Sequence, residues 1–296
     1  MAGLARFTRA IVGHHRLRCA VAISGHDASA GIRGKRCLGD IAGRRADYGG
    51  LGADGCLCLF EQLLRYPAGN RGRPAGANPL KLNGILGGTF DPVHIGHVQL
   101  ARDALSQLHL DALRCVPAGQ PPHRTLPWAC AQDRLAMVRL AFASEPGCFV
   151  DDAEIRQAGP SWTIETLERL WQQVPDTAHV LILGADALLG LPSWRRWQEL
   201  LNYAHIAVAN RPGAALVPAF MPEPLRSFWA DSFTADWSRL RQQRAGCLVS
   251  FNIAPCEVSA TRVRQQRAQG LPVTGLLPAA VENYIQQNHL YTLTAC

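Results

Sequence analysis

The residues best suited to chemistry stand together at positions 87–97, which read Gly-Gly-Thr-Phe-Asp-Pro-Val-His-Ile-Gly-His. Two adjacent glycines, Gly87 and Gly88, let the backbone approach a bulky ligand because neither carries a Cβ atom. His94 and His97 follow at the expected start of a helix, where free backbone N–H groups and partial positive charge receive phosphate oxygens. Together these residues predict a triphosphate site in which positioning and charge stabilisation provide the catalysis.

The chain around this segment alternates expected strands and helices. An apolar strand over 83–86 leads into it, and a helix over 97–108 leads away from it. The other expected strands are 112–116, 149–151, 179–183, 205–209 and 248–253, and the other expected helices are 132–142, 163–174, 194–201, 260–269 and 278–288. This alternation predicts an α/β fold, a Rossmann-like doubly wound parallel sheet with helices on both faces. Ligands of such sheets bind beyond the carboxyl ends of the strands, where the two glycines stand.

The segment 87–97 resembles the signature of the nucleotidyltransferases that move AMP or CMP from a nucleoside triphosphate onto a phosphate or alcohol. The amino-acid sequence of this segment is most similar to that of the bacterial nicotinate-nucleotide adenylyltransferases, and the resemblance extends over about residues 83–291. It implies that His94 and His97 are catalytic and donate hydrogen bonds to phosphate oxygens. The ATP-binding residues that it implies in this segment are Gly87, Gly88, Thr89 and Phe90.

Two later segments add to the expected ATP site. Gly184 and Asp186 follow the most apolar strand and are similar to the family's Gly-Ala-Asp-Ala-Leu, which implies a role in ATP binding. Residues 258–264, Val-Ser-Ala-Thr-Arg-Val-Arg, resemble the family's Ile-Ser-Ser-Thr-x-Ile-Arg. There Ser259 is expected to cap a helix and to bind ATP with Thr261, and Arg264 is expected to be catalytic. Ala260 replaces the family's second serine, which removes one hydroxyl from this cluster.

Three segments are expected to hold the acceptor. The loop Pro121-Pro122-His123-Arg124 resembles the family's Pro-Pro-His-Lys/Arg, and 161–166 resembles its Ser-Tyr-Thr-Ile-Asp-Thr. The implied nicotinate mononucleotide contacts are His123, Arg124, Thr163, Ile164, Trp194 and Arg195. Trp194 resembles the aromatic residue that stacks on the nicotinate ring in relatives.

The neighbours of these acceptor residues have structural interpretations. Ser161 suits a helix cap, with Ile164 and Leu167 on the buried side of that helix. Trp197 suits core packing. Residues 133–137 are interpreted mainly as a helix start with a cap and surface charges.

The resemblance implies transfer of the adenylyl group of ATP to nicotinate mononucleotide, giving deamido-NAD and pyrophosphate in NAD biosynthesis. Mg²⁺ is the expected cofactor, bound mainly through the ATP phosphates, since no acidic metal cage is evident and no residue is assigned as a metal ligand. Other acceptors, nicotinamide mononucleotide or phosphopantetheine, remain open alternatives. So does a nucleotide-binding regulator without catalysis, although intact His94, His97 and Arg264 argue against it. The sequence does not indicate an oligomeric state.

Charge divides the chain at about residue 80. Residues 1–80 hold 12 Lys and Arg against 5 Asp and Glu, whereas 81–296 hold 18 of each. A nucleic-acid-binding role for the main domain therefore lacks electrostatic support. The domains expected are a basic, irregular and disordered N-terminal extension over 1–80 and a nucleotidyltransferase domain over 81–296. Translated upstream sequence, a transit peptide and a nucleic-acid-binding arm are the alternative interpretations of the extension.

The remaining composition favours a protein of the cytoplasm. Apolar residues make up 48% and charged residues 18% of the chain, and no apolar run is long enough for a transmembrane helix. Ten cysteines are scattered without a Cys-x-x-Cys pair. Such a pattern is typical of a reducing compartment and gives little support to a zinc site.

Overall fold

The computed structural model describes residues 78–121, 126–211 and 218–292, together with the backbone of four short strands near the N-terminus. The chain divides into two compact units, Met1–Tyr66 and Pro67–Cys296. The first contains two antiparallel pairs, β1 (Ala10–Val12) with β2 (His15–Leu17) and β3 (Leu38–Ile41) with β4 (Arg44–Asp47). The expected disorder of 1–80 stays a prediction.

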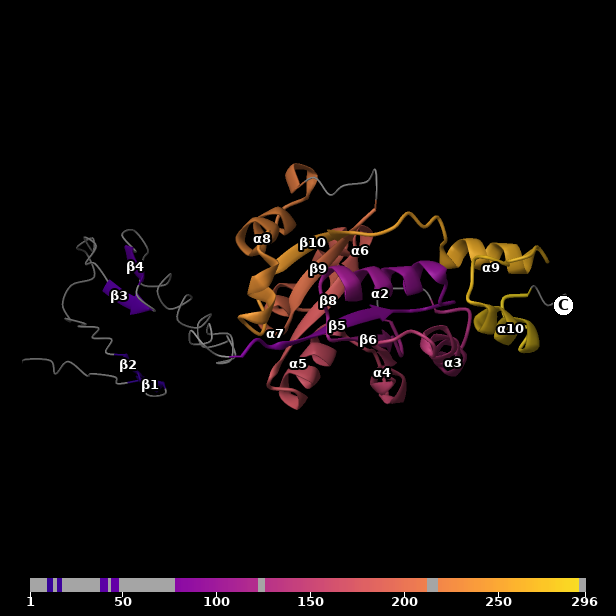
Figure 1. Cartoon of the computed structure of the whole chain (residues 1–296), viewed down its shortest axis with the longest axis horizontal. Coiled ribbons are helices and arrows are strands. Elements are labelled where there is room, and N and C mark those ends of the chain that lie inside the picture. Colours follow the sequence, from indigo (N-terminus) through magenta and orange to yellow (C-terminus); the bar gives the residue numbers. More distant parts are fainter. Residues whose placement is uncertain are drawn as a thin grey trace, which may run out of the picture. The chain divides into compact units, whose positions relative to one another are not determined.

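A six-stranded parallel sheet organises the second unit (Figure 1). Its strands are β5 (Lys81–Gly88), β6 (Ala112–Pro117), β7 (Cys148–Val150), β8 (Thr177–Gly184), β9 (His205–Asn210) and β10 (Leu248–Asn252). They lie in the order β10-β9-β8-β5-β6-β7. The chain therefore winds outward from β5 through β6 and β7, returns to β8 on the other side, and winds outward again. The expected doubly wound sheet is confirmed, and its switch point lies between β5 and β8.

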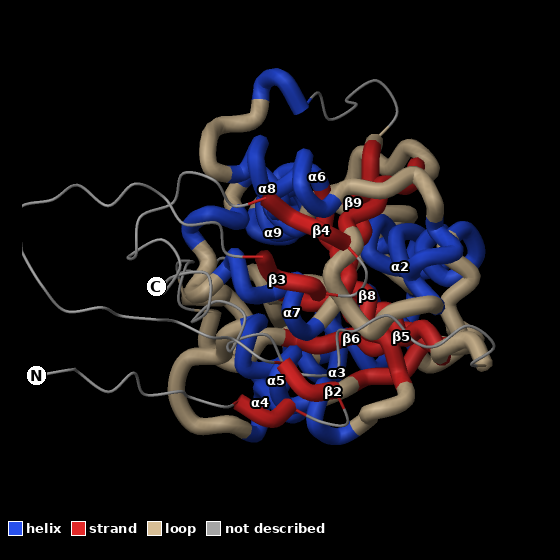
Figure 2. Tube along the Cα trace, turned by 90° about the vertical axis from the view of Figure 1, so that its left-hand side faces the viewer, coloured by secondary structure: helices blue, strands red, loops and turns tan. Residues whose placement is uncertain are grey.

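Helices connect the strands and cover both faces of the sheet (Figures 1 and 2). They are α2 (Ile95–Gln107), α3 (Ala131–Phe142), α4 (Ala153–Arg156), α5 (Thr163–Gln173), α6 (Ala185–Leu189), α7 (Leu200–Tyr203), α8 (Leu225–Ser232), α9 (Ala260–Ala268) and α10 (Ala279–Gln287). Short 3-10 turns occupy Leu191–Ser193, Trp197–Glu199, Pro218–Phe220 and Trp237–Arg241. In Figure 1, α9 and α10 lie at the end of the unit toward which β5 points.

The hydrophobic core has two parts, one on each face of the sheet. Along β8, Val180 and Ile182 join the part formed with α2, α3 and α10, whereas Leu181 and Leu183 join the part formed with α5, α7 and α8. Successive side chains of a strand point to opposite faces, so a strand covered on both sides is apolar at most of its positions. This explains why the most apolar stretch of the sequence lies beside β5 in the middle of the sheet.

Two local predictions were wrong. The helix expected over 194–201 is interrupted, because Arg196 has a φ of 52°, a left-handed conformation that an α-helix cannot include. A 3-10 turn and the short helix α7 replace it. Ser161 does not cap α5: the capping position is Trp162, and the buried Ser161 lies one residue before it. Ile164 and Leu167 are buried as expected.

Within the described residues, no helix combines the length and apolar character needed to cross a membrane.

Candidate active site

The two glycines that end β5 leave open space at the carboxyl edge of the sheet. A Cβ atom built on Gly87 would meet no other atom within 4 Å, so a ligand can approach the backbone there. The ring of Phe90 lies under Gly88, at 3.3 Å from the position of such a Cβ. Phe90 is buried in the core and has a φ of 51°. Any contact of Phe90 with ATP would therefore use its backbone, whereas Thr89 is only half-buried.

The two histidines of the motif form a stacked pair at the start of α2. His94 occupies the capping position and His97 is the third helical residue. Their ring centroids are 3.8 Å apart, and the ring of Phe90 meets His97 edge-on with centroids 4.9 Å apart. The backbone N–H of His94 donates to Nδ1 of His97 at 3.2 Å. Because Nδ1 of His97 accepts this bond, the proton of the neutral ring is on Nε2, which is therefore the donor nitrogen of this ring.

The imidazole of His94 is buried and uncharged at neutral pH. Burial, with a smaller contribution from the positive charge of Arg211, lowers the pKa of His94 to about 4. A neutral imidazole can still donate one hydrogen bond, so His94 can serve a phosphate oxygen without carrying charge.

Acid is expected to destabilise the fold through its buried histidines. Burial also lowers the pKa of His179 and of His205 to about 4. Between the ordinary pKa of about 6.5 and about 4 the unfolded chain binds more protons than the folded one, so stability falls as the pH falls through this window. Urea unfolding at pH 7.5 and at pH 5 measures the loss. The variant His179→Leu is expected to lose less stability over this range, and equal stability of the wild type at both pH values would contradict the prediction.

Asp91 connects the histidine loop to two distant parts of the chain. Its buried carboxylate accepts hydrogen bonds from the N–H groups of Trp128 at 2.8 Å and Ala129 at 3.1 Å. It also accepts one from the hydroxyl of Tyr291 at 2.8 Å, and burial raises the pKa of that hydroxyl. Nη1 of Arg264 donates to the backbone oxygen of Asp91 at 2.6 Å. The carboxylate is thus engaged by three donors and serves the loop rather than a ligand.

Arg264 reaches the histidine loop from α9. Its Nη2 donates to the hydroxyl of Thr261 at 3.3 Å, one turn earlier on the same helix. Ser259 caps α9 as predicted, because its hydroxyl accepts from the N–H of Arg262 at 3.2 Å. The exposed ring of Trp128 lies 5.8 Å from the guanidinium carbon of Arg264. A cavity of about 280 Å³ opens here and is lined by Trp128, Thr261, Arg264, Gln265, Ala268 and Gln269.

The strand beside β5 brings Gly184 to the same edge of the sheet. Gly184 is the last residue of β8, and a Cβ atom there would meet no other atom within 4 Å. Asp186 is exposed in the first turn of the helix that follows. Since β5 and β8 are parallel neighbours, Gly87 and Gly184 both lie at the carboxyl edge.

Four of the residues expected to hold the acceptor, Thr163, Ile164, Trp194 and Arg195, lie at or near α5. Thr163 and Ile164 are its first residues, and the side chain of Ile164 is buried, so only its backbone is available to a ligand. Arg195 pairs with Glu165 at 3.2 Å, and its guanidinium lies 5.2 Å from the centre of the Trp162 ring. Trp194, which follows the 3-10 turn Leu191–Ser193, is partly buried against the α5 side of the core.

The loop after β6 lies against this group. The N–H of Ser161 donates to the backbone oxygen of Gln120 at 3.2 Å, and Gln120 pairs with Pro160. His123 and Arg124, which continue this loop, lie outside the described residues, so their expected role stays a prediction.

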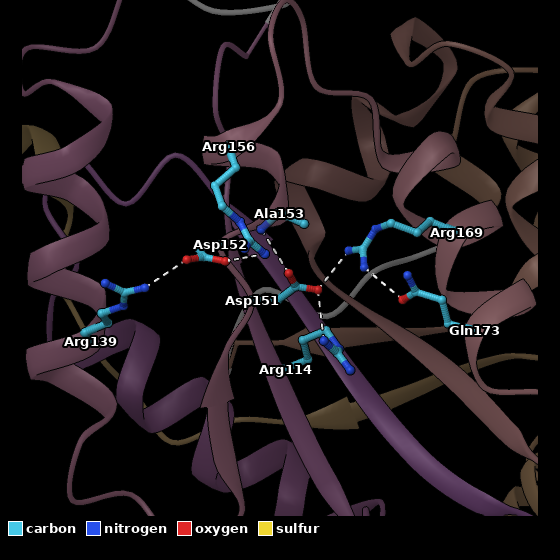
Figure 3. Close-up of polar contacts among 8 residues, drawn as sticks. All are labelled: Arg114, Arg139, Asp151, Asp152, Ala153, Arg156, Arg169 and Gln173. Atoms are coloured by element: carbon cyan, nitrogen blue, oxygen red, sulfur yellow. Dashed lines mark hydrogen bonds and ion pairs between the residues drawn. The ribbon is translucent and has the colours of Figure 1, made fainter.

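An ion-pair network braces this side of the sheet (Figure 3). Asp151, directly after β7, accepts from Arg114 of β6 at 2.9 Å and from Arg169 of α5 at 2.8 Å. It also accepts from the N–H of Ala153 at 3.0 Å, which fixes the start of α4. Because Asp151 is buried, these bonds tie β6, α4 and α5 into one rigid support.

Arg134 is not the surface charge that the sequence suggested. It is 1% exposed, and its guanidinium donates to the backbone oxygens of Thr89, Ala118 and Gly119. The signal that could have revealed it is helical spacing, since position 134 shares a face with the buried Met137 and Val138.

No group of three His, Cys, Asp or Glu side chains suitable for a metal ion occurs in the described ranges.

Comparison with known proteins agrees with this geometry. A family model described as cytidylyltransferase-like matches residues 85–266. A probable nicotinate-nucleotide adenylyltransferase of Dechloromonas aromatica is 43% identical over 209 residues, which cover 70% of this chain and 96% of the relative. One of Aeromonas hydrophila is 47% identical over 209 residues, with the same coverage.

Solved structures agree on the fold. A Plasmodium falciparum nicotinic acid mononucleotide adenylyltransferase complexed with APC gives a TM-score of 0.54 at 14% identity, over 71% of this chain and 97% of that one. The same enzyme complexed with NaAD gives 0.53 at 15% identity, with the same coverage. At such identities the likeness concerns the fold. The family model and the two bacterial relatives show that the chain belongs to the cytidylyltransferase-like family and, within it, to the nicotinate-nucleotide adenylyltransferases.

Proposed function

We propose that this chain transfers the adenylyl group of ATP to nicotinate mononucleotide, with His94, His97 and Arg264 as its catalytic residues. The observation that carries the assignment of residues is the joining of the histidine loop to Arg264 through Asp91 at the carboxyl edge of the sheet. The names of the bacterial relatives support the reaction. So does the Plasmodium enzyme of the same fold, which was solved in complex with NaAD.

The reaction needs alignment more than it needs an acid or a base. A phosphate oxygen of the mononucleotide attacks the α-phosphorus of ATP, the bond from this phosphorus to the bridging oxygen breaks, and pyrophosphate leaves with that electron pair. The acceptor phosphate is already a nucleophile, so no covalent enzyme intermediate is required. The protein has to hold two polyanions in line and stabilise the charge that develops on the transferred phosphoryl group and the leaving pyrophosphate.

The histidine pair is proposed to face the reacting phosphate. Nε2 of His97 would donate to an oxygen of the α-phosphoryl group, since Nδ1 is already occupied by the backbone of His94. Neutral His94 would donate to a neighbouring oxygen. The backbone at Gly87, Gly88, Thr89 and Phe90 would border the nucleotide, with Gly184 and Asp186 across the switch point.

The start of α9 is proposed to hold the β- and γ-phosphates. The backbone N–H groups of its first turn and the hydroxyls of Ser259 and Thr261 lie at this end of α9, and Thr261 accepts a hydrogen bond from Arg264. Family members have a second serine where this chain has Ala260, so fewer hydroxyls are available here. We propose that Mg²⁺ would bind mainly through the ATP phosphates, where it would supply positive charge to offset the negative charge of the phosphates.

Arg264→Ala is expected to lower kcat/KM for ATP by about 100-fold, because a charge-assisted contact with the leaving group is lost. Steady-state kinetics with ATP varied at saturating acceptor measures the effect. Arg264→Lys, which keeps the charge but not the fork of donors, is expected to lose less. A kcat/KM of the alanine variant within about threefold of the wild type would remove Arg264 from the mechanism.

Trp194→Ala is expected to raise KM for nicotinate mononucleotide by about two- to tenfold with little change in KM for ATP, since only stacking on the acceptor ring is lost. Thr163, Ile164, Arg195, His123 and Arg124 are proposed to complete this acceptor site. Equal changes in both KM values would show that Trp194 supports the fold rather than the acceptor. Trp128→Ala is a suitable control, because Trp128 lies beside Arg264 instead.

Pyrophosphate release with ATP, Mg²⁺ and each candidate acceptor tests the proposed function. Strong release with nicotinate mononucleotide and weak release with nicotinamide mononucleotide would support it. Preference for the amide or for phosphopantetheine would retain the mechanism and change the substrate. No release with any acceptor, from folded protein that binds ATP, would favour a regulator.

The organisation of the chain and its location are also proposals. We propose that catalysis needs only residues 81–296 and that the basic segment 1–80 is not part of the active site. The deletion variant lacking 1–80 should then retain the wild-type kcat.

A cytoplasmic location is supported by the scattered cysteines of the sequence.

A further inference from the structure

Arg134 places a buried cation between the two loops that border the glycine motif. It lies on α3 and is 1% exposed. Its Nη1 donates to the backbone oxygen of Thr89 at 2.7 Å and to that of Ala118 at 2.6 Å, and its Nη2 donates to that of Gly119 at 2.8 Å. Thr89 follows β5, whereas Ala118 and Gly119 follow β6. One side chain therefore joins the loops that leave two neighbouring strands.

These bonds continue the pairing of β5 and β6 past the end of the sheet. The last paired residues of the two strands are Gly88 and Pro117, and the N–H of Ala118 still donates to the oxygen of Gly88 at 2.9 Å. Beyond this point the loops diverge, and the guanidinium provides the next connection between them.

The contacts also fix which way the peptide groups of the loops face. In a planar trans peptide the C=O and the following N–H point in opposite directions. The bond from Arg134 to the oxygen of Thr89 therefore turns the N–H of Phe90 away from Arg134, and the bond to Ala118 does the same for the N–H of Gly119. Loss of the guanidinium would free these peptide groups to rotate.

The loop after β6 is restrained on its other side as well. A Cβ atom on Gly119 would lie 2.1 Å from the backbone oxygen of Glu154, so this glycine packs directly on α4. The network around Asp151 in turn holds the start of α4 (Figure 3). Arg134 and α4 thus confine the loop from two sides.

Burying the guanidinium of Arg134 costs free energy, which indicates that its hydrogen bonds do more than fill space in the core. Within the described residues no carboxylate lies within ion-pairing distance of Arg134, and burial lowers its pKa despite the nearby charge of Asp91. Burying a cation without a paired anion is unfavourable, and an apolar side chain of similar volume would fill the same space at a lower cost in free energy. The three carbonyl contacts are what the guanidinium adds.

We propose that Arg134 is a positioning residue for adenylyl transfer: it holds the loops after β5 and β6 in the conformation that aligns ATP with the acceptor. The reaction named here rests on the proposed function, but the effect on the loops does not. Arg134 need not touch either substrate.

The experiment compares Arg134→Met with Arg244→Met. Arg244 also donates to backbone oxygens, those of Trp171 at 2.9 Å and Val174 at 3.2 Å, and burial likewise lowers its pKa. It lies near the oxygen of Thr177, the first residue of β8, and thus at the amino edge of the sheet, away from the glycine motif. Arg244 is half-buried, and it therefore controls for the general cost of losing an arginine that donates to backbone oxygens. Each variant is measured for kcat, KM for ATP and amide hydrogen exchange of peptides spanning 86–92 and 116–121.

Arg134→Met is expected to lower kcat by about 100-fold with a much smaller change in KM for ATP, because misplacement of reacting groups by about 1 Å has such an effect. Exchange in both peptides should rise. Arg244→Met should unfold at a lower urea concentration than the wild type but keep its kcat and its exchange rates in these peptides. Arg134→Lys, which restores part of the contacts, should lie between Arg134→Met and the wild type.

A kcat for Arg134→Met equal to that of Arg244→Met, or unchanged exchange in the two loops, would overturn the proposal. If Arg134→Met does not fold, Arg134→Lys decides: the proposal requires raised exchange in both loops and a kcat about tenfold below the wild type. Failure of the proposed function would be seen differently, because the wild type itself would then release no pyrophosphate. The comparison of amide hydrogen exchange between the variants would still test the effect of Arg134 on the loops.

Discussion

His97→Ala is expected to lower kcat by about 100- to 1,000-fold while ATP binding changes little, because a donor aimed at developing charge acts mainly in the transition state. The structure gives this expectation a specific atom. Nδ1 of His97 accepts from the backbone of His94 at 3.2 Å, so Nε2 is the nitrogen that can donate to a phosphate oxygen. Steady-state kinetics for kcat and calorimetric titration for ATP affinity measure the two effects separately.

Two further variants at this position separate the functions of the two nitrogens. His97→Asn places an oxygen or nitrogen near the position of Nδ1, whereas His97→Gln places a donor near that of Nε2. The glutamine variant should therefore retain more activity than the asparagine variant. Equal kcat values for His97→Ala and the wild type would remove the assigned role. If His97→Asn retains more activity than His97→Gln, the nitrogen that acts in catalysis is Nδ1 rather than Nε2.

Asp91→Ala is expected to lower the free energy of unfolding by about 3–5 kcal/mol, since it removes a buried carboxylate and leaves its donors without a partner. Those donors are the N–H groups of Trp128 and Ala129 and the hydroxyl of Tyr291. Urea unfolding monitored by tryptophan fluorescence measures the loss. The kcat should fall as well, because the histidine loop loses the bonds that the Asp91 carboxylate accepts, although the bond from Arg264 to the backbone oxygen of Asp91 remains possible.

Tyr291→Phe is the matched control for Asp91, because it removes one of the three donors and leaves the carboxylate in place. Its expected cost is about 1 kcal/mol. Asp91→Asn should be nearly as destabilising as Asp91→Ala, since its amide group would present a donor where the site already supplies donors. An Asp91→Ala variant within about 1 kcal/mol of the wild type would contradict the structural role assigned to this carboxylate.

The sheet was predictable because its physical requirements are local. Strands that are covered on both faces need near-continuous apolar runs, and β8 has one from Val180 to Leu183. The glycine motif and the cap at Ser259 were equally local signals, since a turn or a cap depends on a few adjacent residues.

The broken helix over 194–201 shows where local signals fail. Nothing in its sequence indicates that Arg196 adopts a left-handed conformation, because such a position usually takes glycine or asparagine. In the structure Arg196 pairs with Glu199 at 2.7 Å, three positions later, and with Glu168 of α5 at 2.8 Å. The contact with Glu168 joins distant positions, so local spacing does not reveal it.

Contacts between distant residues were the other part that the sequence could not reveal. Tyr291 and Asp91 are 200 positions apart, so the helix expected over 278–288 gave no indication of the hydrogen bond that Tyr291 donates. Arg134 was assigned to the surface from its charge, although its helical spacing matched the buried face. At position 134 the charge of the side chain predicted exposure and the helical spacing predicted burial, and the prediction from the spacing was correct.

The proposed reaction is tested most sharply by following radiolabel from ATP labelled at its α-phosphate. The full chain is incubated with Mg²⁺ and nicotinate mononucleotide, and the products are separated. We expect the label to appear in deamido-NAD, pyrophosphate to form in equal amount, and His97→Ala to abolish most of the transfer. Label that remains in ATP with folded, ATP-binding wild-type protein, or that moves equally well in His97→Ala, would contradict the mechanism.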